Sequence, residues 1–353
     1  MSSLSCLLIG NESLTIQCGE ILIGRGHRIA AVVTRAPEVR SWAKERGLRV
    51  EAPGASLGIR LGDLSGDRAV DWLFSVANLS VIRDDVLELA RQGAVNFHDG
   101  PLPAYAGLNA PVWAILNREA THGITWHLIE GGIDEGDILE ARSFEVLPED
   151  TALALNTRCY GAAIESFGPL VAQLEAGTPA RQPQDLSRRS YFGRDDRPRA
   201  GGRLDFRRDA EDLVALVRGL DHGSYWNPMT VAKIVAADGR LLRVGAAVPL
   251  ERPGSPLPGS VLEATTERLV VATGTGPVAL SGLTDLRGTP VCPKTVASVG
   301  DVLASADPAE AEAITACLAG LAPQDGYWRR RLAGLDPAEL PQAQSAATEG
   351  EIA

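Results

Sequence analysis

The sequence predicts an α/β protein in which a doubly wound, mostly parallel sheet is followed by a small barrel-like domain. In the first half of the chain, apolar runs of strand length alternate with helical patterns, starting with runs at 4–9 and 28–34. This alternation is typical of a parallel sheet covered by helices. Near residue 180 the composition shifts to Pro, Gln, Arg, Ser and Gly, as in a linker. Short strand-like runs with glycine turns follow and predict an OB-like barrel.

These observations divide the chain into four parts: an α/β domain at 1–180, a linker at 181–202, a barrel-like domain at 203–300, and a helical, poorly ordered tail at 301–353. In the first domain we expect strands at 4–9, 28–34, 71–77, 94–97, 123–129 and 137–146, and helices at 14–25, 37–46, 83–91 and 151–177. In the rest we expect strands at 204–206, 231–236, 241–245, 260–263, 268–272 and 278–283, and helices at 210–220 and 308–322.

The bulk composition is that of an ordinary globular protein of 353 residues. A net charge of −11 and a pI of about 5.1 argue against nucleic-acid binding, because phosphate contacts need clustered Lys and Arg. Five cysteines without CxxC spacing predict neither a disulfide framework nor a zinc site, and they favour the reducing cytoplasm. No apolar stretch approaches the ~18 residues of a membrane span, so we expect no membrane association.

Three polar residues lie at or beside the ends of predicted strands, where the sites of α/β sheets are found. Asn96 and His98 are two residues apart, so their side chains share one face of a strand. An amide and an imidazole on one face can donate two hydrogen bonds to one oxygen, as an oxyanion site for acyl transfer does. Asp134 follows the glycine pair at 131–132 and can orient that imidazole.

Plainer interpretations exist for the same residues. His98 can simply be a strand-end histidine that bonds a carbonyl group, and Asp134 a turn residue. A zinc site from His98, His122, His127 and Asp134 is a further alternative. However, His122 and His127 are five residues apart, and such residues face opposite sides of an extended run. We therefore predict no metal ion. We expect His127 to pack in the core or to contact a residue of the site without touching the substrate. The GxSxG elbow of a Ser-His-Asp triad is absent.

The candidate residues belong to a longer pattern: NFH at 96–98, PLP at 101–103, Gly107, HGIT at 122–125 and GIDEGD at 132–137. This pattern resembles the motif of the formyltransferases that use 10-formyltetrahydrofolate, and the similarity extends over residues 4–177. Residues 203–228 are similar to the start of the C-terminal domain of methionyl-tRNA formyltransferase. The resemblance implies that 1–180 is a Rossmann-like catalytic domain and that 10-formyltetrahydrofolate is the co-substrate, with no metal ion.

The resemblance also implies roles for individual residues. Asn96 and His98 stabilise the oxyanion formed when an amine attacks the formyl carbon, His98 moves the amine's proton, and Asp134 holds His98 in its working tautomer. A pterin slot of mostly main-chain contacts is expected nearby. By position it is lined by Asn78, Leu79, Ser80, Val81, Ile82, Glu130, Gly131, Gly132 and Ile133. Burial in the core is the alternative interpretation of Leu79, Val81 and Ile82.

Departures from the family pattern bear on the acceptor. Asp99-Gly100-Pro101 stands where many relatives carry a serine, and no basic loop follows Leu102, where the tRNA enzymes have one. The stretch GYWRRRLAGL at 326–335, with ELP at 339–341, resembles a short motif of nonribosomal peptide synthetase modules; an amphipathic helix with a basic face is the plainer interpretation. We therefore expect an aminoacyl group on the phosphopantetheine arm of a carrier protein as the acceptor.

Other functions remain open from the sequence. An amino-sugar nucleotide is the next candidate acceptor, ahead of Met-tRNA. A hydrolase that releases formate from 10-formyltetrahydrofolate is a second class of enzyme. A different acyl or one-carbon reaction at the same site is a third. A folate-binding or assembly-line interaction domain is the non-enzymatic alternative.

Overall fold

The computed structural model describes residues 3–65, 69–251 and 257–332. The last part of the predicted tail, 333–353, and with it the end of the synthetase-like motif, lies outside the described residues. The elements of the first half are β1 (Ser5–Ile9), α1 (Ser13–Gly24), β2 (Arg28–Val33), α2 (Pro37–Glu45), β3 (Val50–Glu51), α3 (Leu57–Arg60), β4 (Val70–Ser75), α4 (Asp84–Leu87), β5 (Ala90–His98), β6 (Ala106–Gly107), α5 (Ala110–Leu116), β7 (Thr121–Leu128), β8 (Ile138–Glu145) and α6 (Ala152–Glu175).

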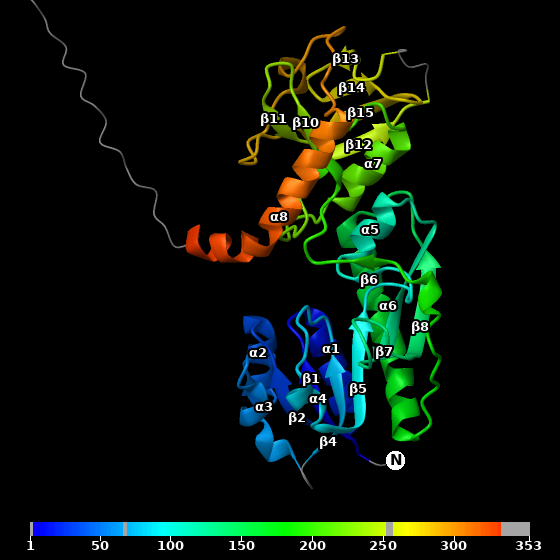
Figure 1. The fold of residues 1–353 in the computed structure, drawn as a ribbon, viewed down its shortest axis with the longest axis vertical. Coiled ribbons are helices and arrows are strands. Elements are labelled where there is room, and N and C mark those ends of the chain that lie inside the picture. Colours follow the sequence, from blue (N-terminus) through cyan, green and yellow to red (C-terminus); the bar gives the residue numbers. More distant parts are fainter. Residues whose placement is uncertain (1–2, 66–68, 252–256, 333–353) are drawn as a thin grey trace, which may run out of the picture.

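A seven-stranded sheet in the order β3-β2-β1-β4-β5-β7-β8 organises this half (Figure 1). Strands β1 to β5 pair in parallel, and β7 runs antiparallel to both of its neighbours. The predicted doubly wound, mostly parallel sheet is therefore confirmed. The carboxyl ends of β1, β4 and β5 lie at one edge of the sheet, where the candidate residues of β5 also lie.

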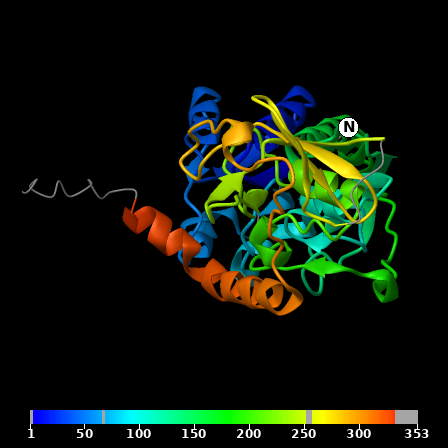
Figure 2. The ribbon, with the colours of Figure 1, turned by 90° about the horizontal axis from the view of Figure 1, so that it is seen from above.

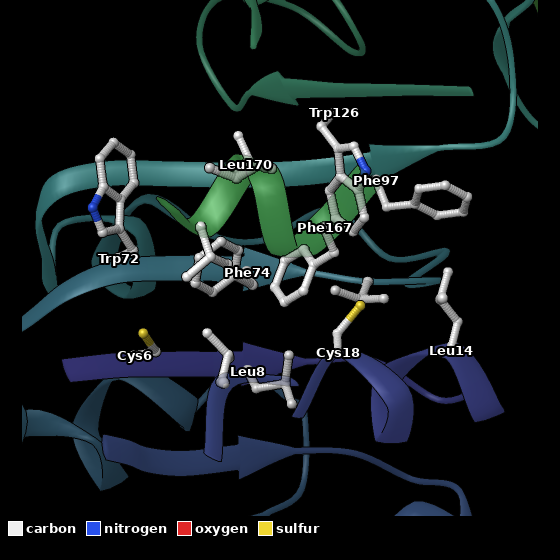
Figure 3. Close-up of a cluster of buried hydrophobic side chains, with 14 of the residues drawn as sticks. Cys6, Leu8, Leu14, Cys18, Trp72, Phe74, Phe97, Trp126, Phe167 and Leu170 are labelled. Carbon is white, nitrogen blue, oxygen red and sulfur yellow. The ribbon is translucent and has the colours of Figure 1, made fainter. Parts of the chain in front are cut away.

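Hydrophobic cores cover both faces of the sheet. On one face, α1 and α6 pack Leu14, Cys18, Phe167 and Leu170 against strand residues such as Phe74, as Figure 3 shows. The Phe167 ring lies 5.2 Å from that of Phe74, an edge-to-face arrangement that adds to plain burial. A second cluster on the other face includes residues of α3 and α4. Because each central strand is buried on both faces, its sequence is a nearly continuous apolar run.

The predicted helix at 83–91 is wrong in its second half. Helix α4 ends at Leu87, and β5 already begins at Ala90. Arg91 and Gln92 are exposed on that strand. In the sequence, these polar residues look like the solvent-facing side of a helix. Pairing of Val70 with Ala90 in the parallel sheet overrides the local helical pattern.

The second half contains β9 (Tyr191–Phe192), α7 (Ala210–Gly219), β10 (Lys233–Val235), β11 (Leu241–Arg243), β12 (Ala246–Pro249), β13 (Val261–Ala264), β14 (Arg268–Ala272), β15 (Pro277–Ser281) and α8 (Pro308–Leu332). Strands β12-β15-β14-β13 form an antiparallel sheet, and β10-β11 a separate hairpin. The predicted small C-terminal domain of short strands is confirmed, and the structure shows that these strands pair antiparallel. Residues 204–206, predicted as a strand, form none: they connect to β10 through the backbone hydrogen bond from Leu204 N to Lys233 O.

Helix α8 is longer than the predicted helix at 308–322, because it continues through Pro323 to Leu332. Only Ala311 of this helix is fully buried, and its second half projects away from the body of the molecule (Figures 1 and 2). Among the residues that the structure describes, no helix is long and apolar enough to cross a membrane.

Candidate active site

Asn96 and His98 lie at the end of β5, on the same face of the sheet. Neighbouring β7 pairs with β5 so that Asn96 lies opposite His127 and His98 lies opposite Thr125. The Thr125 hydroxyl donates to Gly100 O (2.8 Å) and accepts from Leu102 N (3.1 Å). The turn after His98 is thereby fixed to the neighbouring strand, and this bonding holds the end of β5 in place.

The His98 ring is buried, with its two nitrogens in different environments. Nε2 lies 2.8 Å from the carbonyl oxygen of Tyr105. A carbonyl only accepts hydrogen bonds, so Nε2 carries a proton. Nδ1 lies 3.6 Å from Asp134 Oδ2, too far for a hydrogen bond. In the neutral ring Nδ1 is therefore a free base, and the nearby carboxylate stabilises the imidazolium that forms when Nδ1 takes up a proton.

Asp134 enters the site from the segment that follows β7. Its backbone is in the left-handed region, with φ +57°, which costs free energy in any residue with a side chain. Its carboxylate accepts a hydrogen bond from Gly107 N (2.8 Å) and lies 3.3 Å from His127 Nε2. Burial raises the pKa of Asp134, but a hydrogen bond from His127 in its protonated form, the charge of His98 in its protonated form and the Gly107 N–H outweigh it and lower the pKa to about 2. Asp134 is thus an anion at physiological pH.

His127, which the sequence analysis assigned to packing or to support of the site, contacts two of the candidate residues. Its Nδ1 donates to the carbonyl of Leu128 (2.8 Å), and its Nε2 lies 3.1 Å from Asn96 Nδ2. A neutral His127 accepts a hydrogen bond from the Asn96 amide, which leaves the second amide N–H of Asn96 available. His127 therefore orients Asn96 and contacts Asp134 at the same time. This role depends on the pairing of β5 with β7, and the sequence around His127 does not indicate that pairing.

The expected slot residues lie on two segments beside this cluster. Leu79 and Val81 are 68% and 83% exposed, and Ile133 is 50% exposed, so the alternative that Leu79 and Val81 are core residues is wrong. Ile82 does pack against a core cluster. Asn78 braces the first segment through bonds to Ser75 Oγ (3.3 Å) and Ser80.

In the second segment, Gly131 has φ +69°, and Gly132 N donates to Glu135 Oε2 (3.1 Å). Glu130 pairs with Arg181 at 2.8 Å. Two short segments with exposed apolar side chains therefore flank the polar cluster. In the described part of the chain, no group of three or more His, Cys, Asp or Glu side chains is arranged to hold a metal ion.

An α/β sheet that presents an amide, a base and a buried carboxylate at its carboxyl edge is the framework of a group-transfer enzyme acting on a carbonyl carbon. Comparison with known proteins gives the family. The formyl transferase model matches residues 61–167, and the model of the formyl transferase C-terminal domain matches residues 198–297. Together they match more than half of the chain, which belongs to the formyltransferase family. The predicted class of enzyme, a formyltransferase, is confirmed.

Individual relatives agree with this placement. The methionyl-tRNA formyltransferase of Geobacter metallireducens is 26% identical over 306 residues, which are 80% of this chain and 91% of that protein. The fold resembles WlaRD, a sugar 3N-formyl transferase solved in the presence of dTDP and 5-N-formyl-THF, with a TM-score of 0.61 and 15% identity over 80% of this chain and 98% of the other. It also resembles the N-formyltransferase of Helicobacter canadensis in complex with folinic acid and dTDP-3-aminofucose (TM-score 0.60, 17% identity, 79% and 99% coverage).

The role of His127 gives a first testable prediction. In His127→Leu the Asn96 amide loses its acceptor, a loss of ~1–3 kcal/mol for a buried donor, and we expect kcat for formyl transfer to fall about 10-fold or more. The control is Thr121→Val, at the exposed opposite end of the same strand, which should leave kcat unchanged. An unaltered kcat in His127→Leu would show that Asn96 is oriented by another group.

Proposed function

We propose that this chain transfers the formyl group of 10-formyltetrahydrofolate to the primary amine of an aminoacyl group carried on the phosphopantetheine arm of a carrier protein. The observation that supports the transfer step is the cluster of Asn96, His98, His127 and Asp134, whose side chains approach one another at 3.1 to 3.6 Å. The reaction is placed in the reducing cytoplasm, which suits five free cysteines.

Each residue of the cluster has a defined task in this reaction. Asn96 donates its available N–H to the formyl oxygen. His98 Nδ1 accepts the proton of the attacking amine, and the resulting N–H then faces the oxyanion. A bond forms between the amine nitrogen and the formyl carbon, and the bond from that carbon to N10 breaks. His98 returns the proton to N10, so tetrahydrofolate leaves neutral at that atom, while Asp134 stabilises the transient imidazolium.

The two flanking segments suit the co-substrate. A pterin is a flat ring with polar edges, and such rings bind where apolar side chains and backbone groups converge. The residues proposed to line its slot are 78–82 and 130–133, because their exposed Leu79, Val81 and Ile133 lie on the segments that flank the cluster. Binding of the ring would remove these apolar side chains from water.

The proposed acceptor rests on charge and on the tail. Residues 99–107 contain no Lys or Arg, and the net charge is −11, so a gripped tRNA stem is disfavoured. Residues 326–332 of the synthetase-like stretch form the end of α8, where Tyr327 and Trp328 are 56% and 51% exposed and precede three arginines. An exposed aromatic and basic helix end is suited to contact a partner that carries a phosphorylated arm.

The acceptor is tested by incubating the purified protein with 10-formyltetrahydrofolate and following tetrahydrofolate formation in parallel samples. One sample receives a carrier protein loaded with an amino acid, one an amino-sugar nucleotide, one Met-tRNA and one no acceptor. We expect turnover with the loaded carrier alone. Turnover with the sugar nucleotide or Met-tRNA instead would overturn the proposed acceptor, and turnover without any acceptor would identify a hydrolase. The unloaded carrier protein is the matched control.

A further inference from the structure

The segment predicted as a linker lies against the active site. Residues 181–194, called the strap below, run beside residues 130–137, the loop that carries Asp134. Gln184 Nε2 donates to the backbone carbonyls of Asp134 (2.9 Å) and Gly136 (2.7 Å). Arg189 donates to the carbonyl of Ile133 (3.0 Å). Arg181 pairs with Glu130 and Asp137 at 2.8 and 2.9 Å. The strap therefore forms hydrogen bonds and ion pairs with the loop from its first residue to its last.

The strap also holds the segment on the other side of the catalytic residues. Its Ser190 hydroxyl accepts from Tyr105 N (2.8 Å), and its backbone pairs with Ala106 and Gly107 through β9. The Phe192 ring stacks on Tyr105 with centroids 5.5 Å apart. Tyr105 supplies the carbonyl that fixes the tautomer of His98, and Gly107 supplies the N–H that binds Asp134. Both backbone partners of the catalytic residues thus depend on the strap.

The loop at 130–137 needs such support because of its own conformation. Asp134 is left-handed without being glycine, and a residue in that state persists only where its surroundings hold it. Gln184 is half-buried, and its amide N–H groups bond directly to this residue and to Gly136. The Oε1 atom of Gln184 is buried without a hydrogen-bond partner among the described residues. Its two donated bonds therefore account for its position.

We propose that the strap is part of the active site and that Gln184 is a positioning residue that holds the loop at 130–137 so that Asp134 faces His98 and His127. Arg194 extends the same strap to the other side of the folate slot, where it donates to the carbonyl of Leu79 (3.3 Å). The kinetic consequence rests on the proposed function. The structural consequence, that Gln184 keeps the loop at 130–137 ordered, is independent of the proposed function.

The test compares two identical substitutions two residues apart. Gln184→Met removes both donors at nearly constant size, and Gln182→Met is the matched control, because the Gln182 side chain is exposed on the same segment. Hydrogen exchange of peptides covering 130–137 is measured in both, together with kcat, KM and urea unfolding. We expect hydrogen exchange in this loop to accelerate about 10-fold or more in Gln184→Met alone, because the loop loses the two bonds that hold it. We also expect kcat to fall by up to about 10²-fold, because Asp134 is displaced, with a smaller change in KM.

Gln184→Lys provides the rescue, because an ammonium group on a chain of similar length again offers donors to both carbonyls. It should keep exchange in the loop slow. Equal exchange in Gln184→Met and Gln182→Met, uniform acceleration over the whole chain, or identical behaviour of the Met and Lys variants would each overturn the proposal. If the wild-type protein transfers no formyl group, the proposed function fails, while the exchange comparison still decides the role of Gln184.

Discussion

His98→Ala is expected to lower kcat for formyl transfer by at least about 10⁴-fold while the fold survives. The ring has two tasks at one atom, since Nδ1 first takes the amine's proton and then donates to the oxyanion. General-base catalysis contributes about 10²–10⁴-fold, and one oxyanion donor contributes about 10²–10³-fold. The buried ring is hydrogen-bonded to the Tyr105 carbonyl and lies 3.6 Å from Asp134. Its loss therefore leaves one backbone acceptor without its donor, while Asp134 keeps the hydrogen bond from Gly107 N.

Single-turnover kinetics with saturating 10-formyltetrahydrofolate measure this loss directly, and circular dichroism and urea unfolding report the fold. The matched control is His222→Ala, a histidine outside the cluster and beyond α7, which should turn over like the wild type. Asn96→Ala should lose about 10²–10³-fold, because it removes a donor but no base. A His98→Ala protein that keeps more than about a tenth of wild-type kcat would contradict the assignment of the site, since general-base catalysis alone exceeds that factor.

The sheet could be predicted from the sequence because its strands are buried on both faces. Residues 6–9 and 29–33 form continuous apolar runs that end in turns, and the structure places β1 and β2 within one residue of the expected bounds. A strand that is buried on both faces is a nearly continuous apolar run, so it can be predicted without knowing which strands it pairs with.

Contacts with distant partners could not be predicted from the sequence. The stretch 181–202 has the composition of a linker, yet Gln184 and Ser190 bond to groups 48 to 85 residues earlier in the chain. The polar start of β5 was likewise attributed to a helix, because the strand it pairs with lies some twenty residues earlier. Local propensity carries no information on such partners.

The candidate site shows the same division. The two-residue spacing of Asn96 and His98 suffices to place both on one face of β5. The contact of His127 with Asn96 depends on the register between β5 and β7, and the register is a property of the assembled sheet. Similarly, the bond from Gly107 to Asp134 joins residues 27 positions apart, and no spacing rule connects them.

Asp134→Asn is expected to lower kcat by up to about 10⁴-fold, the loss that the same substitution beside the catalytic histidine causes in a hydrolytic triad. The amide can still accept from Gly107 N, so the loop keeps that bond. It presents no negative charge to His98 Nδ1, 3.6 Å away, so the imidazolium formed during amine attack loses its counter-ion. The folate affinity of this variant should change far less than kcat, and equilibrium binding measures that affinity separately.

The same variant makes a prediction about stability with a definite sign. The pKa of Asp134 is lowered from its ordinary value of 3.8 to about 2 in the folded protein, so its ionisation stabilises the fold by roughly 2 kcal/mol at pH 7. That contribution is fully present above about pH 4 and is lost as the pH falls through 2. Urea unfolding should therefore show Asp134→Asn less stable than the wild type at pH 7, with a difference that shrinks between pH 4 and 2. A difference that is independent of pH over this range would mean that the native contacts of Asp134 do not depend on its charge.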